Sequence, residues 1–336
     1  MLPADLAAWV KNRAEEVGFH RCRIAQAEAI GRADYLQAWL SAGRAGTMGY
    51  LHQHLKERMD PRELLPGARS VIVTALLYHQ PVDGPSTTGP REESAAPARG
   101  RVAMYAWGDD YHDVMRTKLA ALAEAIRPIA PGPFEFKVCV DTSPLLEREW
   151  AAAAGIGWIG KNTMVLDHQL GSYFFLGELL TTLELPADDP LADRCGTCTA
   201  CLEACPTGAF PAAYQMDPSR CISYLTIEHR GPIDPSFHAA MDDWIFGCDI
   251  CQEVCPHNRH APITHEPRLA PRPLGPRPVL EEILGLSDDD YRKQLKGSAI
   301  KRAKLDMLKR NAQIAMANIA DRPETSRSFS RNCRLS

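Results

Sequence analysis

Eight of the eleven cysteines in this chain lie between Cys195 and Cys255. The first four form the run CGTCTACLEACP, which begins at Cys195 and has the spacing C-x2-C-x2-C-x3-C-P. This spacing is typical of paired [4Fe–4S] clusters, in which the fourth cysteine binds the neighbouring cluster. The second run, CDICQEVCP, begins at Cys248 and lacks one cysteine, because Ile245 stands at the expected position. Cys221, farther upstream, is the obvious replacement.

An exchange of fourth ligands between the two runs predicts which thiolates hold each cluster. One cluster would be held by Cys195, Cys198, Cys201 and Cys255, and the other by Cys205, Cys221, Cys248 and Cys251. Zinc is an alternative, but a tetrahedral zinc site has no use for the middle cysteine or for the two Cys-Pro steps. Disulfides fit poorly, because residues 1–20 read as an amphipathic helix rather than an export signal. Thiols of a protein that is not exported stay reduced. The chain is therefore expected to be cytoplasmic and to move electrons.

The composition is that of an ordinary globular protein. Of 336 residues, 45% are hydrophobic and 24% are charged, and this length allows two or three domains. No apolar stretch reaches the ~18 residues that a membrane span needs, so no membrane association is expected. The net charge of −4 argues against a protein that binds nucleic acid in bulk, although a mean can conceal a local basic stretch.

The elements expected before the cysteines alternate between strands and helices. Residues 70–78 read as a buried strand, 110–127 as a helix and 134–140 as a strand that ends on Asp141. Thr142 or Ser143 is expected to cap a helix that reaches about residue 154, and 173–185 predict one or two more strands. Strands alternating with helices predict an α/β domain.

The remaining segments complete the expected organisation. Residues 81–100 lack core-forming side chains and predict a mobile surface loop, and 261–278 hold six prolines and predict an extended connector. Residues 280–320 have helical patterning, and the polar tail contains Cys333 as an ungrouped thiol. Three domains are therefore expected, at residues 1–185, 186–260 and 261–336.

Asp141 is the candidate acid outside the cysteine runs. A carboxylate at the carboxyl end of a strand lies where ligands usually bind in α/β domains, and burial there could raise its pKa enough to hold a proton at neutral pH. The alternative is that Asp141 only caps the following helix. Cys139, two residues earlier, is expected to point the same way and to pack.

Two further stretches could bind ligands. Residues 155–162 (GIGWIGKN) follow a helix rather than a strand, so they fail as a dinucleotide fingerprint, but glycines allow close approach to a planar cofactor, and Lys161 and Asn162 could anchor it. Residues 292–310 carry eight basic side chains opposed only by Asp306. This basic run favours phosphate contacts, and without aromatic side chains beside it structured RNA fits better than a single strand.

Taken together, these stretches resemble the epoxyqueuosine reductase family, the cobalamin-dependent iron–sulfur enzymes of tRNA modification. The resemblance runs from about Arg58 to Asn311. It is carried by the complete cysteine set and by the segments RMDPRELLPGARSVIV, YAWGDDYHDVM, VDTSPLLER, AGIGWIGKN, GSYFFLGELLTT, RCISYLTIEHRG and GSAIKRAKLDMLKRNAQIA. The related reductive dehalogenases usually carry a twin-arginine export signal, which this sequence lacks.

The resemblance implies a fold and a reaction. The fold would be of the α+β or α/β class, with a nitroreductase-like cobalamin-binding domain, a two-cluster ferredoxin-like domain and a HEAT-like helical segment that is shorter here than in many relatives. Electrons from the clusters would reach cobalamin, which would reduce the cyclopentane epoxide of epoxyqueuosine in the tRNA anticodon loop to queuosine, the last step of queuosine biosynthesis. Asp141 would protonate the epoxide oxygen.

The resemblance also implies binding residues. Those near the corrin would be Arg58, Ala103, Asp141, Lys161, Ser172, Gly247 and Cys248. Those that contact tRNA would be Arg230, Lys301, Arg302, Lys304 and Arg310, most of them on a basic C-terminal helix. A reductant protein such as a flavodoxin or ferredoxin would supply electrons, and the chain is expected to be a monomer.

Three other functions remain open at this point. A plain two-cluster electron carrier would bind no cobalamin. A cytosolic cobalamin-dependent dehalogenase would not need the basic run. A tRNA-binding protein with structural clusters would not need Asp141.

Overall fold

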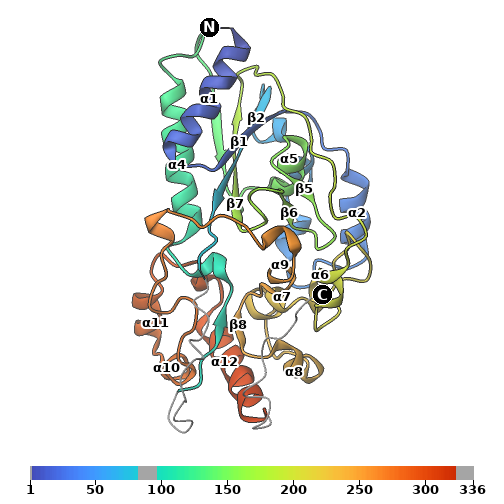
Figure 1. The fold of residues 1–336 in the computed structure, drawn as a ribbon, viewed down its shortest axis with the longest axis vertical. Helices are drawn as coiled ribbons and strands as arrows, with labels where there is room; N and C mark the ends of the chain where they lie inside the picture. Colours follow the sequence, from blue (N-terminus) through green and yellow to red (C-terminus); the bar gives the residue numbers. More distant parts are fainter. Residues whose placement is uncertain (1, 82–96, 323–336) are drawn as a thin grey trace.

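The computed structural model describes residues 2–81 and 97–322. Most of the segment predicted as a surface loop (81–100) and of the polar tail, including Cys333, therefore lies outside the described residues. The N-terminal half of the chain forms an antiparallel sheet with helices on both of its faces (Figure 1). No helix of the described chain is both long enough and apolar enough to cross a membrane.

The sheet has four strands in the order β1-β2-β7-β4. These are β1 (Arg21–Gln26), β2 (Ser70–Leu77), β7 (Phe174–Thr181) and β4 (Phe136–Cys139), and every neighbouring pair is antiparallel. The strands expected at 70–78, 134–140 and 173–185 are thus confirmed. The expected mixture of strands and helices is present, and the sheet is antiparallel throughout; the direction of its strands depends on pairing between distant segments and not on local periodicity.

Helices cover both faces of the sheet. α1 (Pro3–Val17) and α4 (Tyr111–Ile126) pack on one face, and α5 (Glu147–Ala153) packs on the other together with the short strands β5 (Trp158–Ile159) and β6 (Val165–Leu166). The register of β4 on β7 sets Cys139 opposite Glu178, so both side chains belong to the α5 face. Cys139 is fully buried, as expected.

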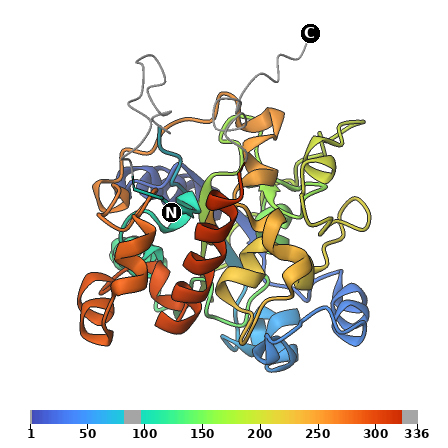
Figure 2. The same cartoon turned by 90° about the horizontal axis from the view of Figure 1, so that it is seen from below.

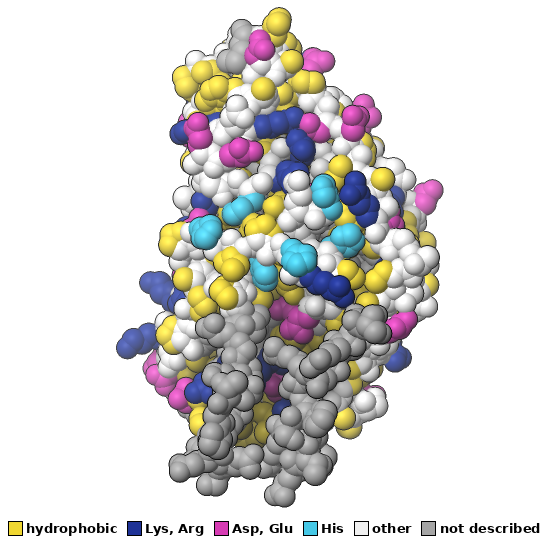
Figure 3. All heavy atoms as spheres, in the orientation of Figure 1, with side chains coloured by type: hydrophobic (Ala, Val, Ile, Leu, Met, Phe, Trp, Pro, Cys, Tyr) yellow, Lys and Arg dark blue, Asp and Glu magenta, His cyan; other side chains and the backbone are white. Residues whose placement is uncertain are grey.

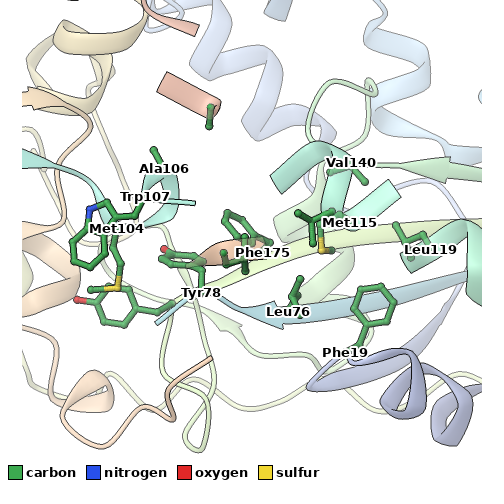
Figure 4. Packing of buried hydrophobic residues seen from close by; sticks show 14 of the residues in the cluster. Phe19, Leu76, Tyr78, Met104, Ala106, Trp107, Met115, Leu119, Val140 and Phe175 are labelled. Carbon is green, nitrogen blue, oxygen red and sulfur yellow. The ribbon is translucent and has the colours of Figure 1, made fainter. Parts of the chain in front are cut away.

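The core continues beyond the sheet into the lower half of the molecule. One hydrophobic cluster contains residues of α1, α4 and the sheet and also residues of the C-terminal helices. Figure 4 shows this continuity in side chains that run from Phe19 and Leu76 past Phe175 and Tyr78 to Met104. The short strand β3 (Arg101–Val102) enters this lower half and pairs in parallel with β8 (Trp244–Phe246).

The C-terminal part is helical, as the patterning predicted, but in several pieces. α12 (Leu305–Ala320) lies between α10 (Leu280–Gly285) and α11 (Asp288–Gln294) on one side and α7 (Ile222–Ile227) and α8 (His238–Met241) on the other (Figure 2). The expected basic helix is wrong in one respect: Lys301 and Arg302 lie in a 3-10 turn, and Lys304 immediately precedes α12. The remaining helices are α2 (Ala33–Ser41), α3 (Leu55–Met59), α6 (Ala200–Glu203) and α9 (Ile250–Glu253).

Candidate active site

A large cavity of about 1,230 Å³ lies where the sheet meets α7 and the turn before α12. Its wall includes Arg58 from α3, Asp141 and Glu147 from the segment after β4, Tyr224 from α7 and Arg302. A second cavity of about 340 Å³ shares the wall residues Tyr105, Tyr111, Asp141 and Glu147 with the first. The two cavities are therefore adjacent, with Asp141 on the boundary between them.

The second predicted cysteine set lines the smaller cavity. Cys205, Cys221, Cys248 and Cys251 all contribute to its wall. Burial raises the pKa of the Cys251 thiol well above its ordinary value, and the neighbouring Cys248 and Cys221 raise it further. These thiols are thus gathered from segments that the sequence keeps apart, beside the wall that carries Asp141.

The first predicted set lies together where α6 packs on α9. Burial first, and then the nearby charges of Cys255, Cys195 and Cys198, raise the pKa of Cys201 to about 11. Cys255, from the second run, therefore lies with the three thiols of the first run. Cys255 is buried whereas Cys198 is exposed, so this set reaches the surface.

The described cysteines do not converge on a point. Within residues 2–81 and 97–322, no group of three Cys, His, Asp or Glu side chains is close enough to hold a single metal ion. A tetrahedral zinc ion draws its four ligands to one centre, whereas a [4Fe–4S] cube spreads them over its corners.

Asp141 stands in a strained turn directly after β4. Its backbone has a φ of 48°, in the left-handed region that non-glycine residues seldom adopt. The backbone N–H of Asp141 donates to the Glu147 carboxyl, which fixes the turn. The expected cap at Thr142 or Ser143 is wrong, since α5 begins only at Glu147. Asp141 is therefore not a helix cap, and its side chain, 55% exposed, faces the cavity.

A histidine joins Asp141 to a second carboxylate. His112 Nε2 lies 3.0 Å from Asp141 Oδ2, and His112 Nδ1 lies 2.6 Å from Asp110 Oδ1. Asp110 also caps α4, because its side chain accepts from the backbone N–H of His112. The cap fixes the imidazole between the two carboxylates, and this chain of three groups ends in the cavity.

The protonation states follow from these contacts. Burial alone lowers the pKa of His112, but its hydrogen bonds to Asp110 and Asp141 outweigh burial and raise the pKa to about 9. Burial alone raises the pKa of Asp141, but the hydrogen bond and the charge of His112, together with the Tyr111 hydrogen bond and the charge of Arg302, outweigh burial, so the net shift is downward. The expectation that burial holds a proton on Asp141 is therefore wrong. At neutral pH the proton is on His112, in contact with Asp141.

Of the residues predicted near the corrin, Arg58 lines the large cavity, whereas Ala103 and Gly247 pack behind Tyr105, which lines both cavities. Arg58 is half-buried on the wall of the large cavity, where its guanidinium donates to the carbonyls of Gln53 and Tyr50 at 3.2 Å. Ala103 and Gly247 touch each other: a Cβ on Gly247 would come within 2.5 Å of the Ala103 Cβ. Gly247 also has a φ of +69°, so this close approach requires glycine.

Lys161 and Ser172 line neither of these two cavities. Lys161 Nζ donates to the carbonyls of Gly196 and Cys198, at 2.6 and 2.9 Å, and so contacts the first cysteine run. Ser172 is buried, and its hydroxyl donates to Gln252 on α9 at 2.9 Å. Both residues support the segments that carry the cysteines.

The basic residues predicted to bind tRNA differ in their surroundings. Lys301 and Lys304 are exposed, and Arg302 lies on the cavity wall and pairs with Glu228 at 2.8 Å. Arg310 is half-buried, and it donates to the carbonyls of Leu225 and His229 and also to that of Gly231. Arg230 is exposed, and its guanidinium lies against the sulfur of Met307. The face of the molecule shown in Figure 3 carries both basic and acidic side chains, with a band of histidines across its middle.

Two groups at the site, His112 and Glu147, could not be selected from the sequence. His112 is 29 positions from Asp141, and only the fold brings the two side chains together. The available signal was the Asp110-x-His112 spacing at the start of a predicted helix. Glu147 could be recognised only as an acidic residue in the first turns of the helix expected after Asp141, where acidic residues are common.

Comparisons with known proteins agree with this geometry. The family described as "Epoxyqueuosine reductase QueG, DUF1730" matches residues 58–142, and the family described as "4Fe-4S double cluster binding domain" matches 194–258. Among curated proteins, the epoxyqueuosine reductase of Pseudomonas aeruginosa is 40% identical over 94% of this chain and 86% of its own length. That of Gloeobacter violaceus is 41% identical over 95% of this chain and 98% of its own length.

Solved structures give the same result. An epoxyqueuosine reductase bound to an epoxyqueuosine-modified tRNA-Tyr stem loop superposes with a TM-score of 0.86 at 32% identity, covering 94% of this chain and 82% of that one. The Bacillus subtilis epoxyqueuosine reductase, with an aspartate-bearing catalytic loop swung out of its active site, superposes with a TM-score of 0.85 at 31% identity over the same shares.

Proposed function

This chain belongs to the epoxyqueuosine reductase family, and from that premise we propose that it reduces the cyclopentane epoxide of epoxyqueuosine in a tRNA anticodon loop to queuosine. The observation that carries the proposal is the position of Asp141, which faces a large cavity on one side and the second cysteine set on the other. An acid and a source of electrons thus border the same space.

The reaction needs two electrons and two protons. Both C–O bonds of the epoxide break, a C=C bond forms, and the oxygen leaves as water. The eight cysteines match the double-cluster family and suit two [4Fe–4S] clusters. The cavity of about 1,230 Å³ exceeds the ~300–1,000 Å³ typical for drug-sized ligands, and its aromatic and apolar walls suit a corrinoid. Bound there, cobalamin would supply low-potential electrons to the epoxide carbon.

Asp141 and His112 would supply the first proton. The proton is held at His112 Nε2, 3.0 Å from Asp141 Oδ2, and its transfer to that oxygen makes Asp141 a carboxylic acid facing the cavity. Asp141 can then protonate the epoxide oxygen as the C–O bond breaks, which converts a poor alkoxide leaving group into a hydroxyl. Asp110 holds the imidazole in position for this transfer.

Other residues would bind the cofactor. Arg58 is available at the wall of the large cavity, and Cys248, as a ligand of the second cluster, would give electrons a short path into the cavities. The tight contact between Ala103 and Gly247 would keep the backbone beneath Tyr105 closely packed. Lys161 and Ser172 would act less directly, by supporting the cysteine segments.

The tRNA would approach the mouth of the large cavity. Arg302 offers positive charge on its wall, and the exposed Lys301, Lys304 and Arg230 would add to it. Arg310 would act mainly through the carbonyls that it holds around α7. Electrons would enter at the first cluster, whose Cys198 is exposed, from a reductant protein such as a flavodoxin or ferredoxin. We expect a cytoplasmic monomer of three domains.

The test is anaerobic purification with added cobalamin, followed by absorption and EPR spectra and then by turnover of epoxyqueuosine tRNA. We expect about eight irons per chain, a base-off cobalamin signal and conversion to queuosine. Iron–sulfur signals without bound cobalamin would instead indicate an electron carrier. Turnover of an organic halide that survives neutralisation of Lys301, Arg302 and Lys304 would indicate a dehalogenase.

A further inference from the structure

The glycine-rich loop of residues 155–162 carries a tryptophan that the chemistry described so far does not use. This residue, Trp158, begins β5 and pairs with Leu166 of β6. The two short strands lie very close together, because a Cβ on Gly157 would overlap the Leu166 carbonyl and one on Gly160 would overlap the Leu166 side chain. The glycines of the loop therefore let Trp158 lie directly on β6.

Trp158 has a buried N–H group that needs an acceptor. The residue is only 3% exposed. Its indole Nε1 has no oxygen or nitrogen acceptor within residues 2–81 and 97–322. A buried N–H group without an acceptor destabilises a protein, so native structures usually provide one. The remaining kind of acceptor in this protein is sulfur.

The first cysteine set lies against the indole. Trp158 forms a small hydrophobic cluster with Leu166 and Cys255, and Cys195 packs against the same cluster. His257, two residues after Cys255, meets the indole edge-on, with 5.0 Å between the ring centroids and 78° between the ring planes. The indole is thus held between β6 and segments of both cysteine runs.

Cys195 is the cysteine that the indole N–H faces. Burial raises the pKa of the Cys195 thiol, whereas the backbone N–H of Lys161 and the indole N–H of Trp158 act in the opposite direction. The segment around Cys195 is also fixed in place. Lys161 Nζ donates to two carbonyls of residues 196–198, at 2.6 and 2.9 Å, and Asp193 Oδ1 accepts the backbone N–H of Cys195 at 2.7 Å.

We propose that the Trp158 indole N–H donates a hydrogen bond to the Cys195 sulfur when that sulfur holds the first [4Fe–4S] cluster, and that this bond raises the cluster's reduction potential. Reduction adds one electron, and the thiolate sulfurs share its charge, so an N–H donor stabilises the reduced cluster more than the oxidised one. The first cluster thereby accepts an electron more readily from a reductant. The inference rests on the two clusters and not on the epoxide reaction.

Trp158→Phe tests the bond, because it removes the N–H and keeps an aromatic ring against Leu166 and His257. A redox titration of the holoprotein with dithionite, followed by EPR, gives a midpoint potential for each cluster. We expect reduction of the first cluster to become about tenfold less favourable, which is a downward shift of about 59 mV for one electron. The second cluster should keep its potential. The signal that Cys221→Ser retains identifies the first cluster.

A matched control is available on α5. Trp150 is also buried, and its Nε1 likewise lacks a hydrogen-bond partner among the described residues. It packs in a different hydrophobic cluster, which contains none of the eight cysteines between Cys195 and Cys255. Trp150→Phe therefore makes the same chemical change away from the first cysteine set, and it should leave both potentials at their wild-type values.

A second replacement separates the hydrogen bond from packing. Benzothienylalanine in place of Trp158 keeps the bicyclic ring and exchanges only the N–H for sulfur, so it should lower the first potential as Trp158→Phe does. A wild-type potential with this analogue, or an equal shift of both clusters, would overturn the inference. A wild-type holoprotein that has both clusters but converts no epoxyqueuosine tRNA would instead contradict the proposed function alone.

Discussion

Asp141 shows at the residue scale how contacts set the pKa of a carboxyl group. A carboxyl in a cavity wall ordinarily gains pKa, yet the imidazolium of His112 holds the pKa of Asp141 below its usual range. In the proposed reaction the acid is therefore a pair, in which His112 Nε2 would store the proton and Asp141 Oδ2 would deliver it. The sequence could single out Asp141, because it follows an apolar strand, but not His112, because only the fold brings the two side chains together.

Asp141→Asn should separate chemistry from binding. The amide keeps the shape of the side chain and can still face His112, but it cannot pass a proton from His112 to the substrate. We expect kcat to fall by about 100- to 10,000-fold with epoxyqueuosine tRNA, while the Kd for tRNA and the iron content stay at wild-type values. Single-turnover assays and filter binding would check this. Retained turnover would assign the acid role to another group.

His112 should also make stability depend on pH. Its folded pKa of about 9 exceeds its unfolded value of 6.5, so its stabilising effect is complete below pH 6.5 and is lost as pH rises through 9. The stability of the wild type relative to His112→Gln should thus fall between these limits, by at most about 1.4 kcal/mol per pH unit. Urea unfolding of the cofactor-free proteins at several pH values tests this; a constant difference would contradict it.

At the scale of elements, the cysteine runs were predictable and the turn after β4 was not. The spacing of ligands within each run is a local property, and the exchange of fourth ligands is typical of such runs, so both sets of thiols could be predicted from the sequence. The start of α5 depends instead on the Glu147 carboxyl, which accepts the Asp141 N–H and delays the helix to Glu147. Strand direction in the sheet and the break between Arg302 and α12 likewise come from packing between distant segments.

The exchange of fourth ligands makes an asymmetric prediction. Cys255 belongs to the second run but lies with the first set of thiols, so Cys255→Ser should damage the first cluster and leave the second. Cys221→Ser should damage the second cluster, whose remaining thiols line the small cavity. Each variant should lose about four of eight irons. EPR of the reduced proteins should show one spectrum in Cys221→Ser and a different one in Cys255→Ser; identical spectra would contradict the exchange.

At the scale of the whole molecule, charge is distributed unevenly around a modest net value. The protein carries a net charge of −4, yet Arg302, which lines the large cavity, is flanked in the chain by the exposed Lys301 and Lys304. The sequence predicted this basic run but not its position. Arg302 lines the cavity from a 3-10 turn rather than from a continuous helix, and Glu228, which follows α7, pairs with it.

Neutralising this group should weaken tRNA binding in a salt-dependent way. Each lost phosphate contact lowers the slope of log Kd against log salt by about 0.7–0.9, so Lys301→Gln, Arg302→Gln and Lys304→Gln combined should lower it by about 2–3. A triple variant of Arg13, Arg69 and Arg127, near the sheet, changes the net charge equally. If the charges act by position, binding titrations across salt concentrations will separate the two variants; if only net charge matters, both will lose affinity equally.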